Sequence, residues 1–271
     1  MKLLNGRELA GYIKERQAHE VRALRQTAQV QPKLAIIITV DHPAIATYVR
    51  MKQRYGADIL VDVDVHRIAQ HEVKALIARL NADPAVHGII VQLPLANPSQ
   101  TDEICDLVAP RKDVDALGRD AVLEPATPLA ILWLLAGYNI NLAGKKVVLV
   151  GRGKLVGAPL ERILRASGHD VTVADSGTPD IAAAVSQADV LITATGQPGL
   201  IVGEMIKTGA VVIDAGVAGE QGKTVGDLAA DVRARDDLTI TPEKGGVGPL
   251  TICALFENVI RSARAASNPS S

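Results

Sequence analysis

Residues 145–159 read KKVVLVGRGKLVGAP and join a short apolar strand to a helix through a glycine-rich loop. The apolar run 147–150 is followed by Gly151, Gly153 and Gly157, a GxGxxxG spacing one residue longer than the usual dinucleotide fingerprint. Small residues permit a tight turn, and the helix N-terminus then offers unpaired N–H groups to a pyrophosphate. The segment predicts a dinucleotide-binding βα unit. The alternatives are a turn that binds nothing or one that binds another nucleotide.

Strands and helices alternate outward from this loop through the C-terminal half of the chain. Helical patterns at 159–166 and 181–187 separate the first strands, and a last helix is expected over 251–264. The expected strands are 147–150, 171–174, 190–195, 211–214 and 239–241. Repeated βα alternation implies a parallel sheet with right-handed crossovers.

The N-terminal half alternates in the same way. Helices are expected at 8–25, 44–55 and 72–80, with a further one starting at Ser99 as its N-cap, and strands at 34–40, 60–65 and 88–93. Between residues 110 and 128 the composition changes to charged residues, glycine and proline, which indicates a domain junction. The fold class that follows is α/β, with two domains.

The composition narrows the function classes. The 271 residues suggest about two domains at roughly 150 residues each, and 29 Lys+Arg against 30 Asp+Glu give a net charge of −1. This balance lacks the positive field of a nucleic-acid binder, and 2% aromatic residues argue against base- or sugar-stacking surfaces. No apolar run reaches the roughly 18 residues of a membrane span, and no signal peptide is evident. The expected location is cytoplasmic, with Cys105 and Cys253 as reduced structural thiols.

Two residues near the glycine loop argue in opposite directions about the dinucleotide. Arg152, inside the loop, suits the 2′-phosphate of NADP, whereas Asp175, at the end of the next strand, suits the free 2′-hydroxyl of NAD. Ser176 can hydrogen-bond to either. The residues alone leave the choice of cofactor open.

Four polar residues of the N-terminal half are candidates for chemistry. Tyr48 and Lys52 fall at i and i+4 on one helix face, where burial can lower a lysine pKa. Gln92 ends a probable parallel strand, where open α/β sheets place ligands, and Asp115 lies at the junction. The alternatives are a solvated helix face, a buried amide and a solvated loop. Asp62, Asp64 and His66 share a strand face, which we interpret as a solvent face rather than a metal site.

Taken together, these segments resemble the bifunctional methylenetetrahydrofolate dehydrogenase/methenyltetrahydrofolate cyclohydrolase family. The matching pieces lie between about residue 42 and residue 255. In order they are HPAIATYVRMK, NADPAVHGIIVQLPLA, APRKDVDAL, PATP, VGRGKLVGAPL, ATGQPG, GAVVIDAGV, GD at 226–227 and TPEKGGVGPLT.

The resemblance implies an enzyme that oxidises 5,10-methylene-tetrahydrofolate with NADP or NAD and then hydrolyses the methenyl product to 10-formyl-tetrahydrofolate. It implies that Lys52 is the key cyclohydrolase residue, that Gln92 positions it, and that Asp115 binds the pterin. It also implies that Arg152 and Ser176 hold the 2′-phosphate. The expected catalytic residues are Lys52, Tyr48, Gln92 and Asp115, and no metal is expected.

The resemblance also implies the binding residues, the domains and the assembly. The N-terminal α/β catalytic domain covers 1–122, completed by a C-terminal helix within 250–271, and a Rossmann-type NAD(P)-binding domain covers 123–249, with the folate cleft between them. The protein is expected to be a homodimer through the Rossmann domains. The expected cofactor-binding residues are Gly151, Arg152, Gly153, Val156, Gly157, Asp175, Ser176, Thr195, Gly196 and Val217. The expected substrate-binding residues are Tyr48, Lys52, Gln92, Leu93, Asp115, Gly245, Gly248 and Pro249.

Four positions depart from the family pattern. Gly153 replaces a serine, Asp175 a histidine, Ala116 a glycine, and Glu243-Lys244 a Val-Pro pair. Two further hypotheses therefore remain beside the bifunctional enzyme with NADP. One is a diverged enzyme with a single activity that uses NAD or a modified folate; the other is a nucleotide-binding module without catalysis.

Overall fold

The computed structural model describes residues 1–220 and 223–267, and these form two compact units. Unit 1 comprises Met1–Ala10 and Thr127–Thr251, and unit 2 comprises Gly11–Ala126 and the described part of 252–271. The expected N-terminal domain included residues 1–10. The structure instead groups them with unit 1, because strand β1 (Lys2–Leu3) pairs with β11 (Thr239–Ile240) of that unit.

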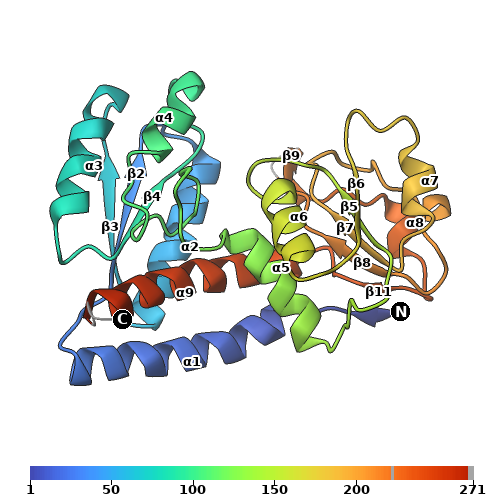
Figure 1. The fold of residues 1–271 in the computed structure, drawn as a ribbon, viewed down its shortest axis with the longest axis horizontal. Helices are drawn as coiled ribbons and strands as arrows, with labels where there is room; N and C mark the ends of the chain where they lie inside the picture. The colour runs from blue at the N-terminus through green and yellow to red at the C-terminus, as the bar shows by residue number, and fades with distance from the viewer. Residues whose placement is uncertain (221–222, 268–271) are drawn as a thin grey trace. The chain divides into compact units, whose positions relative to one another are not determined.

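Unit 2 is built on a three-stranded parallel sheet in the order β3-β2-β4 (Figure 1). Alternate residues of the central strand lie on opposite faces of the sheet. Ala35 and Ile37 pack with residues of α3 and α4 on one face. Leu34 lies on the other face, where Val259 of α9 also lies. The elements of this unit include α1 (Gly6–Thr27) and α9 (Val247–Ser267), whose first residues belong to unit 1. The others are β2 (Lys33–Ile38), α2 (Pro43–Asp58), β3 (Asp62–Arg67), η1 (Gln70–Glu72), α3 (Val73–Ala82), β4 (Gly88–Val91), η2 (Pro98–Gln100) and α4 (Thr101–Cys105).

Unit 1 holds a six-stranded sheet in the order β1-β11-β8-β7-β5-β6, in which all pairings are parallel. From β5 the chain moves to β6 on one side and then to β7 on the other. The elements are α5 (Ala126–Gly137), β5 (Val147–Val150), α6 (Gly157–Ala166), β6 (Val171–Ala174), α7 (Ile181–Val185), β7 (Val190–Thr193), η3 (Gly203–Met205), β8 (Val211–Asp214), β9 (Ala218–Glu220), β10 (Lys223–Val225) and α8 (Ala230–Arg233), besides β1 and β11.

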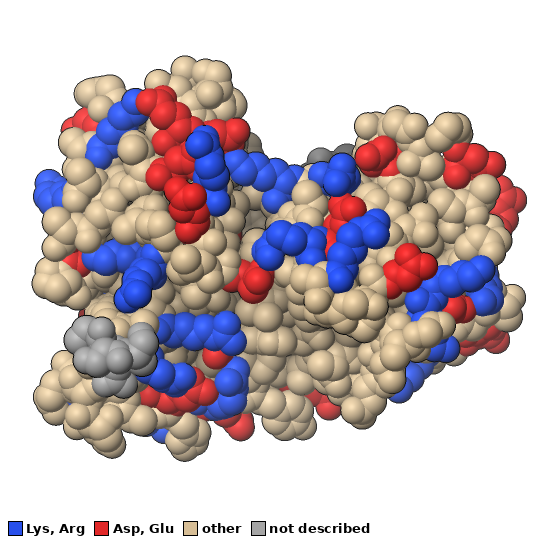
Figure 2. Space-filling model, viewed as in Figure 1, with Lys and Arg blue, Asp and Glu red and all other residues tan. Residues whose placement is uncertain are grey.

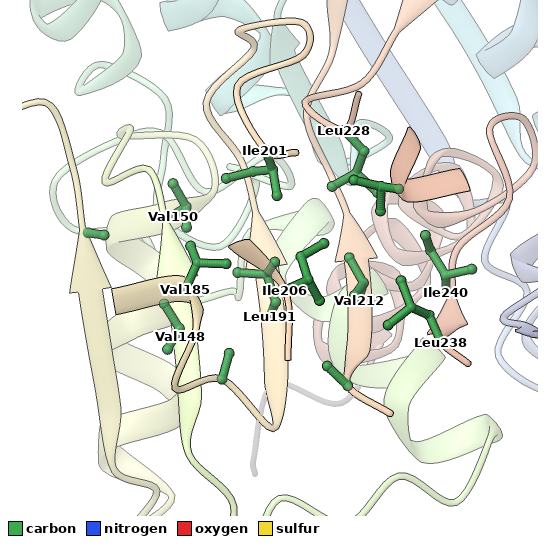
Figure 3. Packing of buried hydrophobic residues seen from close by; sticks show 14 residues of the cluster. Val148, Val150, Val185, Leu191, Ile201, Ile206, Val212, Leu228, Leu238 and Ile240 are labelled. Atoms are coloured by element: carbon green, nitrogen blue, oxygen red, sulfur yellow. The ribbon is translucent and has the colours of Figure 1, made fainter. Parts of the chain in front are cut away.

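One buried hydrophobic cluster of unit 1 lies on one face of this sheet. Figure 3 shows Leu191, Val212 and Ile240 extending from neighbouring strands beside Val185 and Ile206 of the covering segments. All five are at most 5% exposed. Strands β5 and β7 are buried along their whole length, as expected for strands that are covered on both faces.

Several predicted elements differ in detail from the observed ones. Ser99 was expected to cap a helix, but Asn97 caps η2 by accepting from the Ser99 amide, and α4 begins at Thr101. The last helix begins at Val247 rather than 251, because Pro249 fits the first helical turn, where no intrahelical N–H bond is lost. Helix α5, strand β1 and the β9–β10 hairpin were not predicted.

The surface that Figure 2 displays carries both signs of charge. Figure 2 shows Lys and Arg interspersed with Asp and Glu on the face that it displays. Ion pairs of the described residues include Lys207 with Asp189 at 2.6 Å and Arg264 with Glu20 at 2.9 Å. Among the described residues, no helix is long and apolar enough to cross a membrane.

Candidate active site

Helix α2 carries the lysine of the site. Ile45 and Val49, at i and i+4, are 6% and 1% exposed and fix one face of the helix on the core. Tyr48 and Lys52 lie on the adjacent face, one turn apart. Tyr48 is 43% exposed, whereas Lys52 is partly buried.

The structure brings Lys52 and Gln92 together. The Lys52 Nζ donates to Gln92 Oε1 at 3.0 Å. Two further hydrogen bonds fix Gln92. Its side-chain Nε2 donates to the Leu93 carbonyl at 3.1 Å, and its backbone N–H donates to the Ile37 carbonyl at 2.9 Å. Gln92 therefore stands at the carboxyl end of β4 with its oxygen directed at the lysine.

Burial lowers the pKa of Lys52 below its ordinary value, and the negative charge of Asp115 opposes that shift. A lysine in this environment holds its proton less firmly than a solvated one. The group can therefore exchange a proton closer to neutral pH and direct its remaining N–H donors at a ligand.

The loop that carries Asp115 is fixed by buried contacts. Asp113, 4% exposed, accepts from the Gly118 amide at 2.8 Å. Asn258, on α9 and fully buried, donates from Nδ2 to the Val114 carbonyl at 2.9 Å. Ala116 occupies φ +54°, the left-handed region that glycine adopts more easily. Asp115 is thereby presented from a rigid turn.

In unit 1, the strand order defines a ligand position. The chain changes direction between β5 and β7, and open α/β sheets bind nucleotides at the carboxyl ends of the strands at such a point. Gly151 begins the β5 loop with φ +101°, and a Cβ on Gly157 would lie 2.0 Å from the Gly151 carbonyl oxygen. The turn thus requires both glycines and leaves the N-terminus of α6 open, so the loop fits a pyrophosphate. Gly153 is exposed and Val156 directly precedes α6.

Arg152 and Asp175, which favour different dinucleotides, each have a hydrogen-bond partner within the protein. Arg152 Nε donates to Glu161 Oε2 on α6 at 2.8 Å. That hydrogen bond lowers the pKa of Glu161, and the same pair raises the pKa of Arg152, with a further contribution from the charge of Asp175. Asp175 Oδ1 accepts from the Gly177 amide at 2.9 Å, and Ser176 between them is exposed.

The loops after β7 and β8 place the remaining expected cofactor residues together. Gly196 has φ +66°, and a Cβ there would lie 3.3 Å from the Val217 carbonyl oxygen. The Thr195 amide donates to Asp227 Oδ2 at 2.7 Å. Val217 is 61% exposed, which is unusual for a large apolar residue and leaves its side chain accessible to a ligand.

The expected folate loop is half loop and half helix. Gly245 has φ +89°, and its carbonyl accepts from the Arg7 amide at 2.9 Å. Gly248 and Pro249 lie in the first turn of α9. Glu243 and Lys244, the charged departures from the family pattern, are exposed.

Sequence reasoning assigned no role to several residues that shape these loops. Glu161 was not singled out, although its i,i+4 spacing to Arg165 was a readable signal. Asp113 and Asp227 lie in the KDVD and GD segments of the family resemblance but were given no role, and Asn258 was not singled out. No group of three or more His, Cys, Asp or Glu suited to a metal occurs within residues 1–220 and 223–267.

Two family models match the chain. The catalytic-domain model of tetrahydrofolate dehydrogenase/cyclohydrolase matches residues 4–115, and the NAD(P)-binding-domain model of the same family matches residues 125–267. The chain is also 39% identical to the bifunctional protein FolD of Moorella thermoacetica, over 97% of this chain and 98% of that protein.

Solved structures agree with these matches. The bifunctional FolD methylenetetrahydrofolate dehydrogenase/cyclohydrolase of Campylobacter jejuni superposes with a TM-score of 0.91 at 36% identity, over 97% of this chain and 99% of that one. The Trypanosoma brucei enzyme, solved with NADP and an inhibitor, gives a TM-score of 0.91 at 33% identity and covers 98% of each chain. By these matches the chain belongs to the tetrahydrofolate dehydrogenase/cyclohydrolase family.

Proposed function

We propose that this protein oxidises 5,10-methylene-tetrahydrofolate with NADP and hydrolyses the resulting methenyl-tetrahydrofolate to 10-formyl-tetrahydrofolate. The observation that carries the proposal is the hydrogen bond from the partly buried Lys52 ammonium to Gln92, with the Asp115 charge nearby. A binding module without catalysis has no use for a desolvated lysine held in this way.

The hydrolytic step depends on Lys52. Water adds to the cationic methenyl carbon and one proton is released. The C–N5 bond then breaks as the proton of the new hydroxyl passes to N5, which leaves the formyl group on N10. Lys52, with its lowered pKa, can accept and return the proton, while Gln92 fixes the direction of the amine. Asp115 accepts the paired N–H donors of the pterin and keeps the folate in one pose.

The oxidative step depends on orientation more than on acid–base chemistry. When bound, NADP would supply the acceptor for the hydride of the methylene carbon. The protein holds the pyrophosphate at the α6 N-terminus, where Gly151 and Gly157 let the backbone approach closely. The residues after β7 and β8, Thr195, Gly196 and Val217, border the same end of the sheet and complete the proposed dinucleotide site.

For the choice between the two dinucleotides, NADP is the proposal and NAD the second candidate. Arg152 is 58% exposed on its side chain and can pair with a 2′-phosphate. Its existing pair with Glu161 and the adjacent Asp175 favour NAD, since both acidic groups compete for the guanidinium. Ser176 completes the proposed 2′ site.

One assay tests both activities and the cofactor. Purified protein is given methylene-tetrahydrofolate with NADP or NAD while reduced dinucleotide is followed, and separately methenyl-tetrahydrofolate while its decay is followed. Reduction with NADP faster than with NAD, and catalysed methenyl decay, are expected. No reduction with either dinucleotide would contradict the dehydrogenase, and decay at the buffer rate would contradict the cyclohydrolase.

The assembly and the location are proposed on the family resemblance. A homodimer through the Rossmann-type unit 1 predicts twice the 28.5 kDa mass of the chain by light scattering. A cytoplasmic location predicts recovery in the cytosolic fraction of the cell. A monomer at micromolar concentration, or recovery elsewhere, would contradict these proposals.

A further inference from the structure

Two buried acidic residues, Asp214 and Asp227, lie beneath the loops that follow β7 and β8 in unit 1. Asp227 is 0% exposed, and the Asp214 side chain is 4% exposed. Asp214 ends β8, and Asp227 follows the β9–β10 hairpin. Buried carboxylates are costly unless they are hydrogen-bonded, so their partners reveal what they hold in place.

Asp227 uses both of its oxygens on the β7 loop. Oδ2 accepts from the Thr195 amide at 2.7 Å, and Oδ1 accepts from the Gln197 amide at 3.0 Å. Two amides spaced by two residues on one carboxylate fix the backbone around Gly196, which itself has φ +66°.

Asp214 links this arrangement to the β8 loop. Its Oδ1 accepts from the Gly216 amide at 3.1 Å and from the Asp227 amide at 3.0 Å, while Oδ2 accepts from Arg233 Nη2 at 2.8 Å. Burial raises the pKa of Asp214, with its amide partners and Arg233 opposing the shift. One carboxylate therefore connects the start of the β8 loop to the residue that holds the β7 loop.

Glycines make the close approach possible. A Cβ on Gly216 would lie 2.1 Å from Asp227 Oδ1, and a Cβ on Gly226 would lie 2.0 Å from Asp214 Oδ2. Any side chain at either position would displace the carboxylate that it meets. The two loops are thus fitted to the two carboxylates at the level of the backbone.

From these contacts we infer that Asp227 is a positioning residue for the dinucleotide, which it serves by holding residues 195–197 rather than by touching the ligand. The inference rests on the proposed function, since Thr195, Gly196 and Val217 are the proposed contacts of the dinucleotide. Dinucleotide affinity should therefore depend on Asp227, and hydrolysis of methenyl-tetrahydrofolate, which uses no dinucleotide, should not.

The test compares Asp227→Asn with Asp231→Asn. In Asp227→Asn, the side-chain NH2 group faces a backbone N–H of the β7 loop. One of the two hydrogen bonds from the Thr195 and Gln197 amides is therefore lost. Asp231 is a control in the same unit, because its Oδ2 accepts from the Gly203 amide at 2.8 Å, away from the loops in question. The dissociation constant of NADP is measured by calorimetry, with melting temperature, KM and kcat for NADP, and methenyl decay alongside.

The expected result is a rise of about tenfold in the Kd and KM of NADP for Asp227→Asn. The kcat at saturating NADP and the methenyl decay rate stay within about twofold, a difference near 0.4 kcal/mol or less. Asp231→Asn keeps the wild-type Kd. Gly216→Ala, which retains every charge but inserts a methyl against Asp227, should raise the Kd in the same direction.

Each other outcome has a distinct meaning. If wild-type protein binds NADP and Asp227→Asn binds it equally well, the positioning role is wrong while the proposed function stands. An equal loss in Asp231→Asn would reduce the effect to general destabilisation and would also overturn the inference. Wild-type protein that binds no NADP would contradict the proposed function itself, and the inference with it.

Discussion

The ammonium of Lys52 and the side-chain oxygen of Gln92 are 3.0 Å apart, although 40 residues separate them in the chain. Parallel pairing of β4 with β2 brings the end of β4 to α2, which follows β2 directly. Replacing Lys52 by Met removes the amine and keeps much of the apolar side chain. Methenyl hydrolysis should fall to the buffer rate, whereas NADP reduction stays measurable, because hydride transfer needs no amine.

Lys74→Met is the control for that substitution, since Lys74 forms a surface ion pair with Glu103. It should leave both activities within about twofold of wild type, as expected for an exposed pair. Wild-type hydrolysis in the Lys52 variant would move the hydrolytic role to another residue.

The lowered pKa of Lys52 also predicts a pH dependence of hydrolysis. The neutral amine is the form that accepts a proton, so the methenyl decay rate should rise with pH through an inflection below 10.5, the ordinary lysine value. The charge of Asp115 raises this pKa, so Asp115→Asn should move the inflection to lower pH. An inflection that is unmoved in the Asn variant, or absent in wild type, would show that Lys52 does not titrate in the step.

The same shift has a consequence for stability. The pKa of Lys52 is lower in the folded than in the unfolded chain, so below both values each state holds the proton and folding bears the full desolvation cost. Between the two values the folded state alone loses the proton, and stability from this group rises with pH. Lys52→Met removes this desolvation cost, so the variant should melt at a higher temperature than wild type at neutral pH. The difference in melting temperature should shrink as the pH rises towards 10.5.

The sequence predicted β5, β6 and β8 with the bounds that the structure has, because apolar residues dominate these three strands. Helix α5 was missed for the opposite reason. No residue from 126 to 135 is exposed, so ATPLAILWLL shows no polar face and no 3.6-residue period. The hairpin of β9 and β10 is short and lacks the alternation that identifies strands.

The site was predictable only in part. Periodicity places Tyr48 and Lys52 one turn apart, but it cannot show that Gln92 lies beside Lys52, since that contact depends on sheet order. The pairing of Arg152 with Glu161 was also out of reach, because a loop residue has no periodic partner. These tertiary contacts determine the pKa values and the charge balance on which the chemistry depends.

Arg152→Ala tests the choice of dinucleotide. The guanidinium should form a charge-assisted hydrogen bond with a 2′-phosphate. Its contact with a 2′-hydroxyl should be weaker, because the hydroxyl is uncharged. The KM of NADP should rise by about tenfold and that of NAD by less than about twofold. Arg165→Ala is a matched control, since Arg165 also pairs with Glu161, at 3.1 Å. An equal loss for both dinucleotides would show that Arg152 does not read the 2′ position.

Asp115→Asn should weaken folate in both reactions. A pterin presents two parallel N–H donors and a carboxylate offers two acceptors, whereas the amide turns one acceptor into a donor. Such a mismatch costs about 1–3 kcal/mol. Folate KM should rise in the oxidation and in the hydrolysis alike, unlike the effect of Lys52→Met. Unchanged folate affinity with both activities intact would leave Asp115 as a loop carboxylate only.

Ala116, directly after Asp115, gives a prediction about stability. Its φ of +54° lies in the left-handed region, which costs an L-residue with a Cβ about 1–2 kcal/mol. Glycine removes this strain but adds about 0.5–1 kcal/mol of backbone entropy to the unfolded chain. Ala116→Gly should therefore stabilise the protein by about 0.5–1 kcal/mol, measured as a higher denaturant midpoint at unchanged m-value.

A matched change at another turn separates strain relief from any general effect of glycine. Ala85 follows α3 in a turn, where its amide donates to Asp83 Oδ1 at 2.9 Å. Its φ is not positive, so its backbone carries no left-handed strain. Ala85→Gly should lower the midpoint, because it adds unfolded-state entropy without relieving strain. Since Ala116 adjoins the proposed pterin anchor, Ala116→Gly should also leave folate KM within about twofold if the turn keeps its shape. A lower midpoint for Ala116→Gly would mean that packing of the Ala116 methyl outweighs the backbone strain.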